Sequence, residues 1–330
     1  MKVALIVKPH VLEIVEREIS APSTDEIQVL VDLVGVCATD VHIYEGEFPK
    51  AKMPLIIGHE FTGIVGEVGS AVKNIKPGSR VAIDPAISCE ICLQCLRGRR
   101  NLCTNRQAYG INLPGGMAER VNVRATNCYV FSEKVSASAA VLTEPLACVL
   151  HAFERLGKVE GLSCLVLGAG AIGLLSTQVA LEKGVASVDQ IDLREERLSS
   201  AKKVGAREVA SKLNDLTQDK WDVVVDATGV VLAIKEGIDA LARGGTLLQI
   251  GVTNPSHEIS ISPYKIFLDE LRIIGSLTTE GNFPEAVRLL ESGRIIHQVI
   301  TGQPLELSDL SDSLRNSQEA RHPKVVVLPG

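Results

Sequence analysis

Four cysteines are concentrated in a stretch of fifteen residues with the pattern Cys-x2-Cys-x2-Cys-x7-Cys. They are Cys89, Cys92, Cys95 and Cys103. Four thiolates on one short loop can surround a Zn²⁺ ion tetrahedrally, with Zn–S distances of about 2.3 Å. Because such a shell leaves no position for water or substrate, the pattern predicts a structural zinc site. Crowded thiols without metal, or an iron–sulfur cluster, are the alternatives.

A second group of possible metal ligands is dispersed along the chain. A cysteine, a histidine and a carboxylate from separate loops can form the open three-ligand shell of a catalytic zinc. A lone cysteine also packs as a small hydrophobe, and a lone histidine often has a structural role, so spacing alone leaves both interpretations open. The members are Cys37, with Thr39, Asp40 and His42 close behind it, the adjacent pair His59 and Glu60, and Glu144.

Residues 168–173 read Gly-Ala-Gly-Ala-Ile-Gly, the pattern G-x-G-x-x-G, between an apolar run and a helical pattern. In a dinucleotide site, the first glycine allows a tight turn, the second lets backbone approach a pyrophosphate, and the third lets helix pack against strand. The phosphates then lie at the helix N-terminus. Asp192 follows Gly173 by nineteen residues, where an acidic side chain accepts hydrogen bonds from the ribose hydroxyls.

The elements that must position these residues fall into three stretches, of which the third is a tail after about residue 277 with one helix and a final strand. Residues 1 to about 145 contain short Val- and Ile-rich runs broken by Gly, Pro and Asp, which predict strands. From residue 163, strand-like runs alternate with helical patterns, which predicts βαβ units and a parallel sheet. The expected strands are 3–7, 27–36, 64–68, 80–83, 163–167, 188–193, 223–227, 246–250, 272–274 and 324–328, and the expected helices are 171–183, 195–204 and 284–291.

A helix is expected to join the first stretch to the second. Thr143 or Glu144 can cap it, Pro145 suits its first turn, and Gly157 can end it in a left-handed conformation. Residues at the start of this helix should therefore face the cleft between the domains.

Composition limits the classes of protein to consider. A chain of 330 residues suits about two domains. A net charge of −6 without a basic tract argues against nucleic acid as a partner. No apolar run approaches the roughly 18 residues of a membrane helix, and no signal peptide is evident. Eight cysteines without such a signal indicate a cytoplasmic protein whose thiols are available for metal.

Together the motifs resemble the zinc-containing medium-chain alcohol dehydrogenases over essentially the whole chain. The segments that carry the resemblance are 35–42 (GVCATDVH), 58–63 (GHEFTG), 76–81 (KPGSRV), the four-cysteine loop, 115–119 (GGMAE), 144–146 (EPL) and the glycine fingerprint with Asp192. Typical members place a third zinc-binding cysteine where Glu144 stands. The chain therefore looks most like the polyol branch of sorbitol, xylitol and arabinitol dehydrogenases, and residues 42–48 look like an arabinitol dehydrogenase.

The resemblance implies a fold of class α/β with two domains. Residues 146–276 would form an NAD-binding Rossmann domain with a doubly wound parallel sheet. Residues 1–145 and 277–330 would form a β-rich, GroES-like catalytic domain, a partly open barrel, with the active site in the cleft between the domains. The resemblance also implies an oligomer, a homodimer or a homotetramer.

The same resemblance implies a mechanism in which zinc lowers the pKa of a substrate hydroxyl and the carbon gives hydride to the nicotinamide. Cys37 and His59 would bind the ion, and Asp40 would orient the histidine. Thr39 would take the substrate proton and His42 would relay it to solvent.

Glu60 and Glu144 compete for the third ligand position. Adjacent side chains of an extended strand point to opposite faces, so His59 and Glu60 reach one ion only if the backbone is irregular there. Glu144, at a helix start, reaches it more simply.

The implied cofactors are two zinc ions per chain, one catalytic and one structural, and NAD. The implied substrate is a small polyol or sugar, whose secondary alcohol is oxidised to give a ketose. Arg197 matches a position where arginine packs beside the adenine. The expected cofactor contacts are Gly168, Gly170, Ala171, Ile172, Gly173, Asp192, Arg197, Thr228, Ile250, Val252 and Ser276.

Two other interpretations stay open. The chain can be a threonine or aldose dehydrogenase of the same family, because nothing in the sequence distinguishes these substrates. It can also be a catalytically silent nucleotide-binding or structural protein on this fold, against which Cys37, His59 and Glu144 argue.

Overall fold

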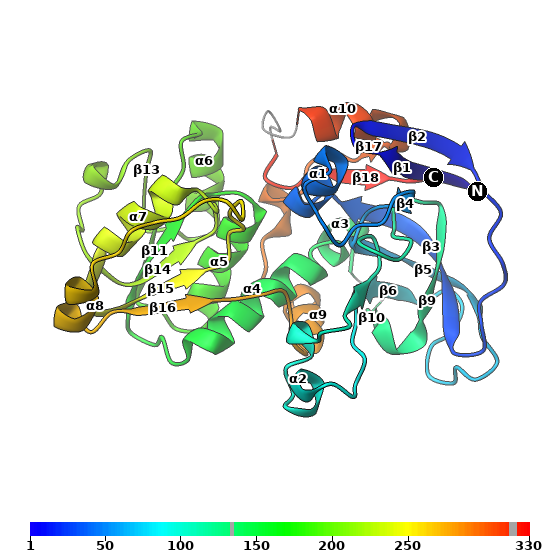
Figure 1. Cartoon of the computed structure of the whole chain (residues 1–330), viewed down its shortest axis with the longest axis horizontal. Coiled ribbons are helices and arrows are strands. Elements are labelled where there is room, and N and C mark those ends of the chain that lie inside the picture. The colour runs from blue at the N-terminus through cyan, green and yellow to red at the C-terminus, as the bar shows by residue number, and fades with distance from the viewer. Residues whose placement is uncertain (133–134, 317–321) are drawn as a thin grey trace. The chain divides into compact units, whose positions relative to one another are not determined.

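The structure is a computed structural model that describes residues 1–132, 135–316 and 322–330. These form two compact units, one of Met1–Glu144 with Phe283–Gly330 and one of Pro145–Asn282. Both chain termini lie in the first unit (Figure 1). The second unit ends at Asn282, six residues after the boundary expected between residues 276 and 277. Both positions lie in the segment that connects the last strand of the second unit to helix α9, Phe283–Glu291.

The first unit is built mainly of antiparallel strands. Its largest sheet has seven strands in the order β10-β6-β5-β3-β18-β17, with β9 also paired to β3. A three-stranded sheet, β2-β1-β4, and a two-stranded sheet, β7-β8, complete it. The strands are β1 Lys2–Lys8, β2 Val11–Glu16, β3 Glu26–Gly35, β4 Leu55–Ile56, β5 Glu60–Val68, β6 Arg80–Ile83, β7 Ala86–Ile87, β8 Gln107–Ala108, β9 Arg120–Arg124, β10 Cys128–Val130, β17 Leu305–Glu306 and β18 Val326–Leu328.

Strand β3 is the centre of this unit. Its long run of apolar residues is buried among β5, β9 and β18, as expected for a strand with neighbours on both edges. At its end, Gly35 lies opposite Glu60 of β5 and opposite Val326 of β18. The N-terminal part of the chain and its last strand therefore meet at Gly35. The helices of this unit are α1 Ala38–Glu45, α2 Leu93–Leu96, α3 Ala137–Ala140, α9 and α10 Leu310–Arg315.

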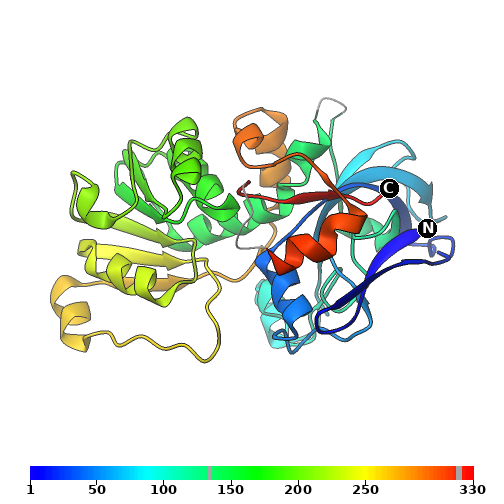
Figure 2. The same cartoon turned by 90° about the horizontal axis from the view of Figure 1, so that it is seen from above.

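The second unit contains a six-stranded parallel sheet in the order β13-β12-β11-β14-β15-β16. Numbered from the first strand of the unit, this is the Rossmann order 3-2-1-4-5-6, so the predicted doubly wound fold is confirmed. Helices cover both faces of the sheet (Figure 2). The elements are β11 Ser163–Leu167, α5 Ala171–Glu182, β12 Ser187–Ile191, α6 Glu195–Lys203, β13 Glu208–Ala210, β14 Trp221–Asp226, α7 Val231–Asp239, β15 Leu241–Gln249, α8 Pro263–Asp269 and β16 Arg272–Gly275.

The junction helix α4 spans Thr143–Leu156. Thr143 and Glu144 are its first two residues, so the expectation that one of them caps the helix from outside was wrong. The reason is local: α3 ends at Ala140, and the Thr143 hydroxyl donates a 2.6 Å hydrogen bond back to the Ala140 carbonyl. Gly157 ends the helix with a φ of 89°, as predicted.

Within the described ranges, no helix combines the length and apolar character that crossing a membrane requires.

Candidate metal and dinucleotide sites

The end of β3 and the start of β5 bring three of the dispersed residues together. One ligand atom each from Cys37, His59 and Glu60 lies within 4.8 Å of the other two. Cys37 directly precedes α1, and His59 and Glu60 follow Gly58, whose φ is 91°. This left-handed glycine is the irregular backbone that lets two adjacent side chains reach one place.

Asp40 holds the two loops in register. Its carboxylate accepts a 2.8 Å hydrogen bond from the Cys37 amide and a 3.2 Å hydrogen bond from the Gly58 amide. The first of these bonds also satisfies the start of α1 in the manner of a capping box. The same carboxylate lies 3.6 Å from His59 Nδ1 and is fully buried. Asp40 therefore ties Cys37 to the turn before His59 and lies beside the histidine ring.

The electrostatics of this cluster favour a cation. Burial lowers the pKa of His59, but the negative charges of Asp40 and Cys37 raise it by more, and the net result is a pKa well above the ordinary value. His59 Nδ1 is buried and has no hydrogen-bond partner among the described residues. A thiolate, an imidazole and a carboxylate are a donor set that suits Zn²⁺.

A fourth group, which the sequence patterns do not indicate, lies at this cluster. Lys324 Nζ donates a 2.8 Å hydrogen bond to Glu60 Oε1 and lies 2.6 Å from Glu60 Oε2. The lysine is 264 residues from Glu60 in sequence, two residues before β18, and no local motif marks it. The pairing of β18 with β3 brings it to the cluster, and sequence patterns do not reveal that pairing.

The other residues predicted for this site lie at different distances from it. The Thr39 hydroxyl is 3.7 Å from Cys37 Sγ. His42 lies further along α1, half-exposed, with Nδ1 2.8 Å from Glu47 Oε2. Glu144 is buried at the start of α4 and lies outside the three-residue ligand set, although its charge acts on Lys324.

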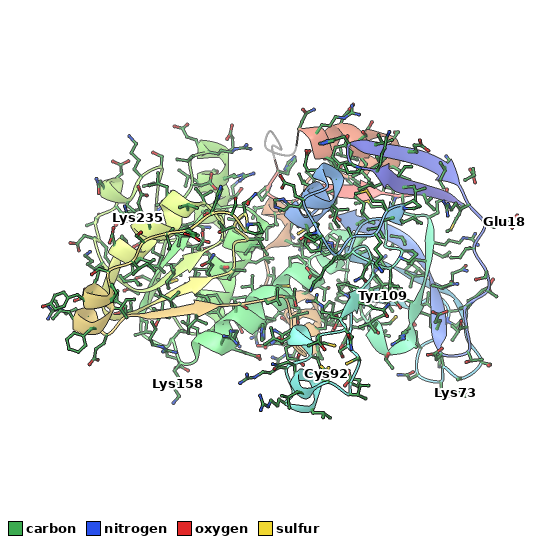
Figure 3. All side chains as sticks on the ribbon, viewed as in Figure 1. Glu18, Lys73, Cys92, Tyr109, Lys158 and Lys235 are labelled. Atoms are coloured by element: carbon green, nitrogen blue, oxygen red, sulfur yellow. The ribbon has the colours of Figure 1, made fainter. Side chains whose placement is uncertain are left out.

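The four loop cysteines also converge. Their sulfur atoms lie within 4.8 Å of one another, and the pairs Cys92–Cys95 and Cys89–Cys103 are 3.5 Å apart. Figure 3 shows Cys92 on the lobe of the first unit that carries α2. All eight cysteines lie within the described ranges and none forms a disulfide.

Backbone amides make this cluster receptive to metal. Hydrogen bonds from the amides of Cys95 and Thr104 lower the pKa of Cys92 to about 5, and those of Ile91 and Cys92 lower the pKa of Cys89. Burial and the neighbouring sulfur of Cys92 raise the pKa of Cys95 to about 12. Four thiolates this close repel one another unless a cation neutralises them, so the geometry fits a closed Cys₄ site.

The second unit gathers the predicted cofactor contacts at one edge of its sheet. Gly168, Asp192, Thr228, Ile250 and Ser276 each follow the carboxyl end of a parallel strand: β11, β12, β14, β15 and β16. In open parallel sheets, ligands bind at this edge, where the strand order reverses. Val252 lies further out on the loop after β15 and is 72 % exposed.

The glycines of the fingerprint have three different surroundings. Gly168 has a φ of 93°, which makes the turn. A Cβ at Gly173 would lie 2.0 Å from the Gly168 carbonyl oxygen, so any side chain there would push α5 off the turn. A Cβ at Gly170 would meet nothing closer than Arg197 Nη1 at 4.0 Å, which leaves room above the turn for a phosphate. Ala171 and Ile172 begin α5 behind it.

Polar atoms around this turn are arranged for a ligand. Asp192 Oδ2 accepts a 2.7 Å hydrogen bond from the Ala169 amide, and Asp192 Oδ1 accepts one of 2.9 Å from the Arg194 amide. Arg197 Nε and Ser276 Oγ, from two predicted contacts, are buried without a hydrogen-bond partner in the described part of the chain. The turn, the carboxylate and these unused donors fit a dinucleotide.

The remaining cysteines take no part in either cluster. Burial raises the pKa of Cys128 to about 12 and that of Cys164 further still, so both are neutral thiols. Cys148 lies within α4.

The second unit has a Rossmann sheet, and the first unit, built from both ends of the chain, carries the two clusters of possible metal ligands. Together these features define the class of zinc-type, nucleotide-dependent dehydrogenases. Comparison with known families agrees. Residues 23–133 match the "Alcohol dehydrogenase GroES-like domain" family, and residues 171–292 match the "Zinc-binding dehydrogenase" family. Together with the relatives below, this shows that the chain belongs to the zinc-containing medium-chain alcohol dehydrogenases and is an oxidoreductase.

Several curated relatives are similar over most of their length. D-arabinitol dehydrogenase 1 of Uromyces fabae is 34 % identical over 98 % of this chain and 95 % of its own. D-altritol 5-dehydrogenase of Agrobacterium fabrum is 35 % identical over 86 % of this chain and 85 % of its own. L-threonine 3-dehydrogenase of Bacillus velezensis is 30 % identical over 95 % of this chain and 94 % of its own. Relatives named for polyols support the polyol branch of the family.

Solved structures share the whole fold. A zinc-binding dehydrogenase from Sinorhizobium meliloti 1021, bound to NADP, has a TM-score of 0.95 and 32 % identity, covering 99 % of each chain. The alcohol dehydrogenase rspB of Escherichia coli CFT073, complexed with NADH, has a TM-score of 0.91 and 31 % identity, again covering 99 % of each chain. The two neighbours differ in their nicotinamide cofactor, so the fold alone does not select between NAD and NADP.

Proposed function

We propose that this chain is a zinc-dependent, NAD-linked polyol dehydrogenase that oxidises a secondary alcohol of a sugar alcohol to a ketone. The observation that carries the proposal is the convergence of Cys37, His59 and Glu60 on one place, with Asp40 behind them and the Thr39 hydroxyl beside the cysteine. This is an open set of ligands with a hydroxyl next to it, which the reaction requires.

Each residue has a distinct part in the proposed reaction. Cys37 and His59 would hold the zinc ion, and Glu60 and Glu144 are the carboxylates available to complete the site. When bound, zinc is a Lewis acid that lowers the pKa of a substrate hydroxyl, and NAD is the hydride acceptor. Thr39 would accept the proton released from that hydroxyl. His42, on the same helix and half-exposed, would pass it to solvent.

The polarity of the site supports a hydroxyl-rich substrate. The buried carboxylates of Glu60 and Glu144 and the buried ammonium of Lys324 make the surroundings of the ligand set polar, whereas an aliphatic alcohol would need apolar walls. The additional hydroxyls of a polyol can hydrogen-bond to such groups, whereas an aliphatic chain cannot.

NAD rather than NADP is proposed from Asp192. Its carboxylate is anchored by two backbone amides at the end of β12, next to the glycine turn. A 2′-phosphate there would meet a like charge.

A substrate panel tests the proposal most directly. The purified, zinc-loaded protein would be assayed with sorbitol, xylitol, arabinitol, an aldose and threonine, each with NAD⁺ and NADP⁺. We expect the highest kcat/KM for a polyol with NAD⁺. A preference for threonine or an aldose would assign the chain to that activity instead, and no turnover with any substrate would favour a silent nucleotide-binding protein. Sedimentation of the same sample would show whether it is the proposed homodimer or homotetramer.

A further inference from the structure

Asp226 is a fully buried carboxylate at the carboxyl end of β14, one of the two central strands of the parallel sheet (Figure 1). Its Oδ1 accepts hydrogen bonds from the Thr228 amide at 2.9 Å and from the Thr228 hydroxyl at 2.6 Å. The Gly229 amide donates to both carboxylate oxygens, at 3.3 and 3.2 Å. An aspartate is almost never fully buried without partners, and these partners belong to the turn that follows its own strand.

The main chain of Asp226 binds a second loop. Its carbonyl accepts hydrogen bonds from the Ile250 and Gly251 amides, at 3.0 and 2.9 Å. These two residues begin the loop after β15, the strand that pairs with β14. Asp226 therefore binds the turn after β14 through its side chain and the loop after β15 through its carbonyl.

The two loops touch through their backbones. A Cβ at Gly251 would lie 2.1 Å from the Gly229 amide nitrogen and 2.7 Å from Asp226 Oδ2. A Cβ at Gly229, whose φ is 68°, would lie 2.1 Å from the Val252 carbonyl oxygen. The Thr253 hydroxyl also donates a 3.0 Å hydrogen bond to the Gly229 carbonyl. The contact therefore leaves no room for side chains, and the carboxylate lies directly against it.

The position of these loops in the sheet indicates which part of a cofactor they would face. A sheet of this strand order is built from two mononucleotide-binding halves. Asp192, on the β11–β13 half, would bind the adenosine ribose, which leaves the β14–β16 half for the nicotinamide nucleotide. Three of the expected cofactor contacts, Thr228, Ile250 and Val252, lie in the two loops that Asp226 joins.

We propose that Asp226 is a positioning residue that fixes these two loops together and so holds the nicotinamide half of the cofactor in place for hydride transfer. The inference rests on the proposed function, because it requires a bound nicotinamide dinucleotide. Loss of the carboxylate should affect the nicotinamide half alone, because Gln190 and Asp192 hold the glycine turn of the other half through separate hydrogen bonds.

Calorimetry and kinetics on the full-length, zinc-loaded Asp226→Asn variant test this. Asparagine keeps the size of the side chain but places an amide N–H against the Gly229 amide, where Asp226 Oδ2 now accepts. We expect Kd for NAD⁺ to rise at least about tenfold, as for a lost buried hydrogen bond, while Kd for ADP, which lacks the nicotinamide nucleotide, is unchanged. The kcat should fall by a similar factor with little change in the KM of the polyol, because the substrate site itself is intact.

Asp222→Asn is the matched control. Asp222 lies at the other end of β14, and its Oδ2 accepts hydrogen bonds from the Ser163 amide and hydroxyl, at 2.8 and 2.7 Å. This variant therefore loses a comparable contact on the same strand and should bind NAD⁺ as the wild type does. Thr253→Val removes only the hydroxyl bond between the two loops. It should weaken NAD⁺ binding by about two- to fivefold, and it keeps the test decisive if Asp226→Asn does not fold.

Three results would overturn the inference and leave the proposed function standing. They are an unchanged Kd for NAD⁺ in folded Asp226→Asn or, if that variant does not fold, in Thr253→Val; an equal loss of affinity for ADP and NAD⁺; and an equal loss of NAD⁺ affinity in Asp222→Asn. Wild-type protein that binds neither NAD⁺ nor ADP would overturn both the inference and the proposed function.

Discussion

Gln190 Nε2 donates a 2.8 Å hydrogen bond to the carbonyl oxygen of Gly168, the first glycine of the fingerprint. The side-chain oxygen of the same fully buried glutamine accepts a 2.8 Å hydrogen bond from the Thr177 hydroxyl on α5. The next two residues also bind the turn, through the Ile191 carbonyl to the Gly168 amide and the Asp192 carboxylate to the Ala169 amide. Three consecutive residues at the end of β12 therefore hold the turn that would carry the phosphates.

This contact predicts a loss of cofactor affinity when Gln190 is replaced by Met, which has similar size but cannot bond to Gly168. The Gly168 carbonyl and Thr177 hydroxyl would be left buried without partners, so we expect Kd for NAD⁺ to rise roughly tenfold, about 1.4 kcal/mol. Calorimetry with NAD⁺, ADP-ribose and adenosine checks it: the pyrophosphate-containing ligands should weaken and adenosine should not. Thr177→Val is the matched control for loss of one hydrogen bond. An unchanged Kd for ADP-ribose would contradict the role assigned to Gln190.

Asp192 predicts the choice of cofactor. We expect NAD⁺ to be preferred over NADP⁺ by at least about a hundredfold in kcat/KM, about 2.7 kcal/mol. Asp192→Ala should lower activity with NAD⁺ and improve the relative use of NADP⁺, since Arg194 and Arg197 stand nearby. Steady-state kinetics with both cofactors measure this. A wild-type protein that uses them equally would remove Asp192 from the ribose site.

The two metal clusters predict two zinc ions per chain that differ in lability. The Cys₄ cluster has a closed set of sulfur ligands, whereas the Cys37–His59 cluster is open, so mild chelation should remove the second ion first. Activity should disappear while the circular dichroism spectrum persists. Elemental analysis before and after chelation gives the count, and a single ion in fully active protein would disprove the two-site prediction.

Glu144 is predicted to contribute to the transition state. Glu144→Gln keeps its size and removes its charge, and we expect kcat/KM to fall by at least about tenfold, roughly 1.4 kcal/mol. The zinc content of the variant, measured in parallel, separates a lost ligand from a lost electrostatic effect. If kcat/KM is unaltered, Glu144 does not belong to the site.

His151 predicts a pH dependence of stability. Burial lowers the pKa of this histidine on α4, so the folded state disfavours the protonated ring. The unfolded chain binds a proton near pH 6.5 and the folded chain only at lower pH, so stability is lost as pH falls below about 6.5. Urea unfolding between pH 7 and pH 5 should show a smaller loss in His151→Gln than in the wild type. Equal losses in the two proteins would exclude His151 as a cause.

Much of this protein is encoded locally and could be predicted without its structure. The four loop cysteines and the glycine fingerprint each lie within fifteen residues, so their spacing alone limits what they can bind. The alternation of strands and helices from residue 163 likewise specified the parallel sheet, which the strand order confirmed. The family membership followed from the order of these motifs, and the comparisons confirmed it.

Other features depended on contacts between distant parts of the chain. The short edge strands, such as β4, β7 and β17, contain two residues each and carry no periodic signal of their own. The helix cap predicted at Thr143 or Glu144 failed because α3 ends just three residues earlier, which local capping rules do not consider. In the sequence, Gln190 looks like an ordinary strand residue. Its role in holding the glycine turn becomes visible only in the structure, where its side chain donates a hydrogen bond to the Gly168 carbonyl.

By itself, the sequence determined which residues can bind metal and nucleotide, because ligand chemistry and short spacings are local properties. Only the tertiary structure decided how the dispersed residues combine. It placed His59 and Glu60 together through the left-handed Gly58, and it brought Lys324 onto Glu60 by pairing β18 with β3. Strand pairing brings residues together at any separation in the sequence. A buried charge such as that of Lys324 requires a partner, and the two groups meet only when the core around them has formed.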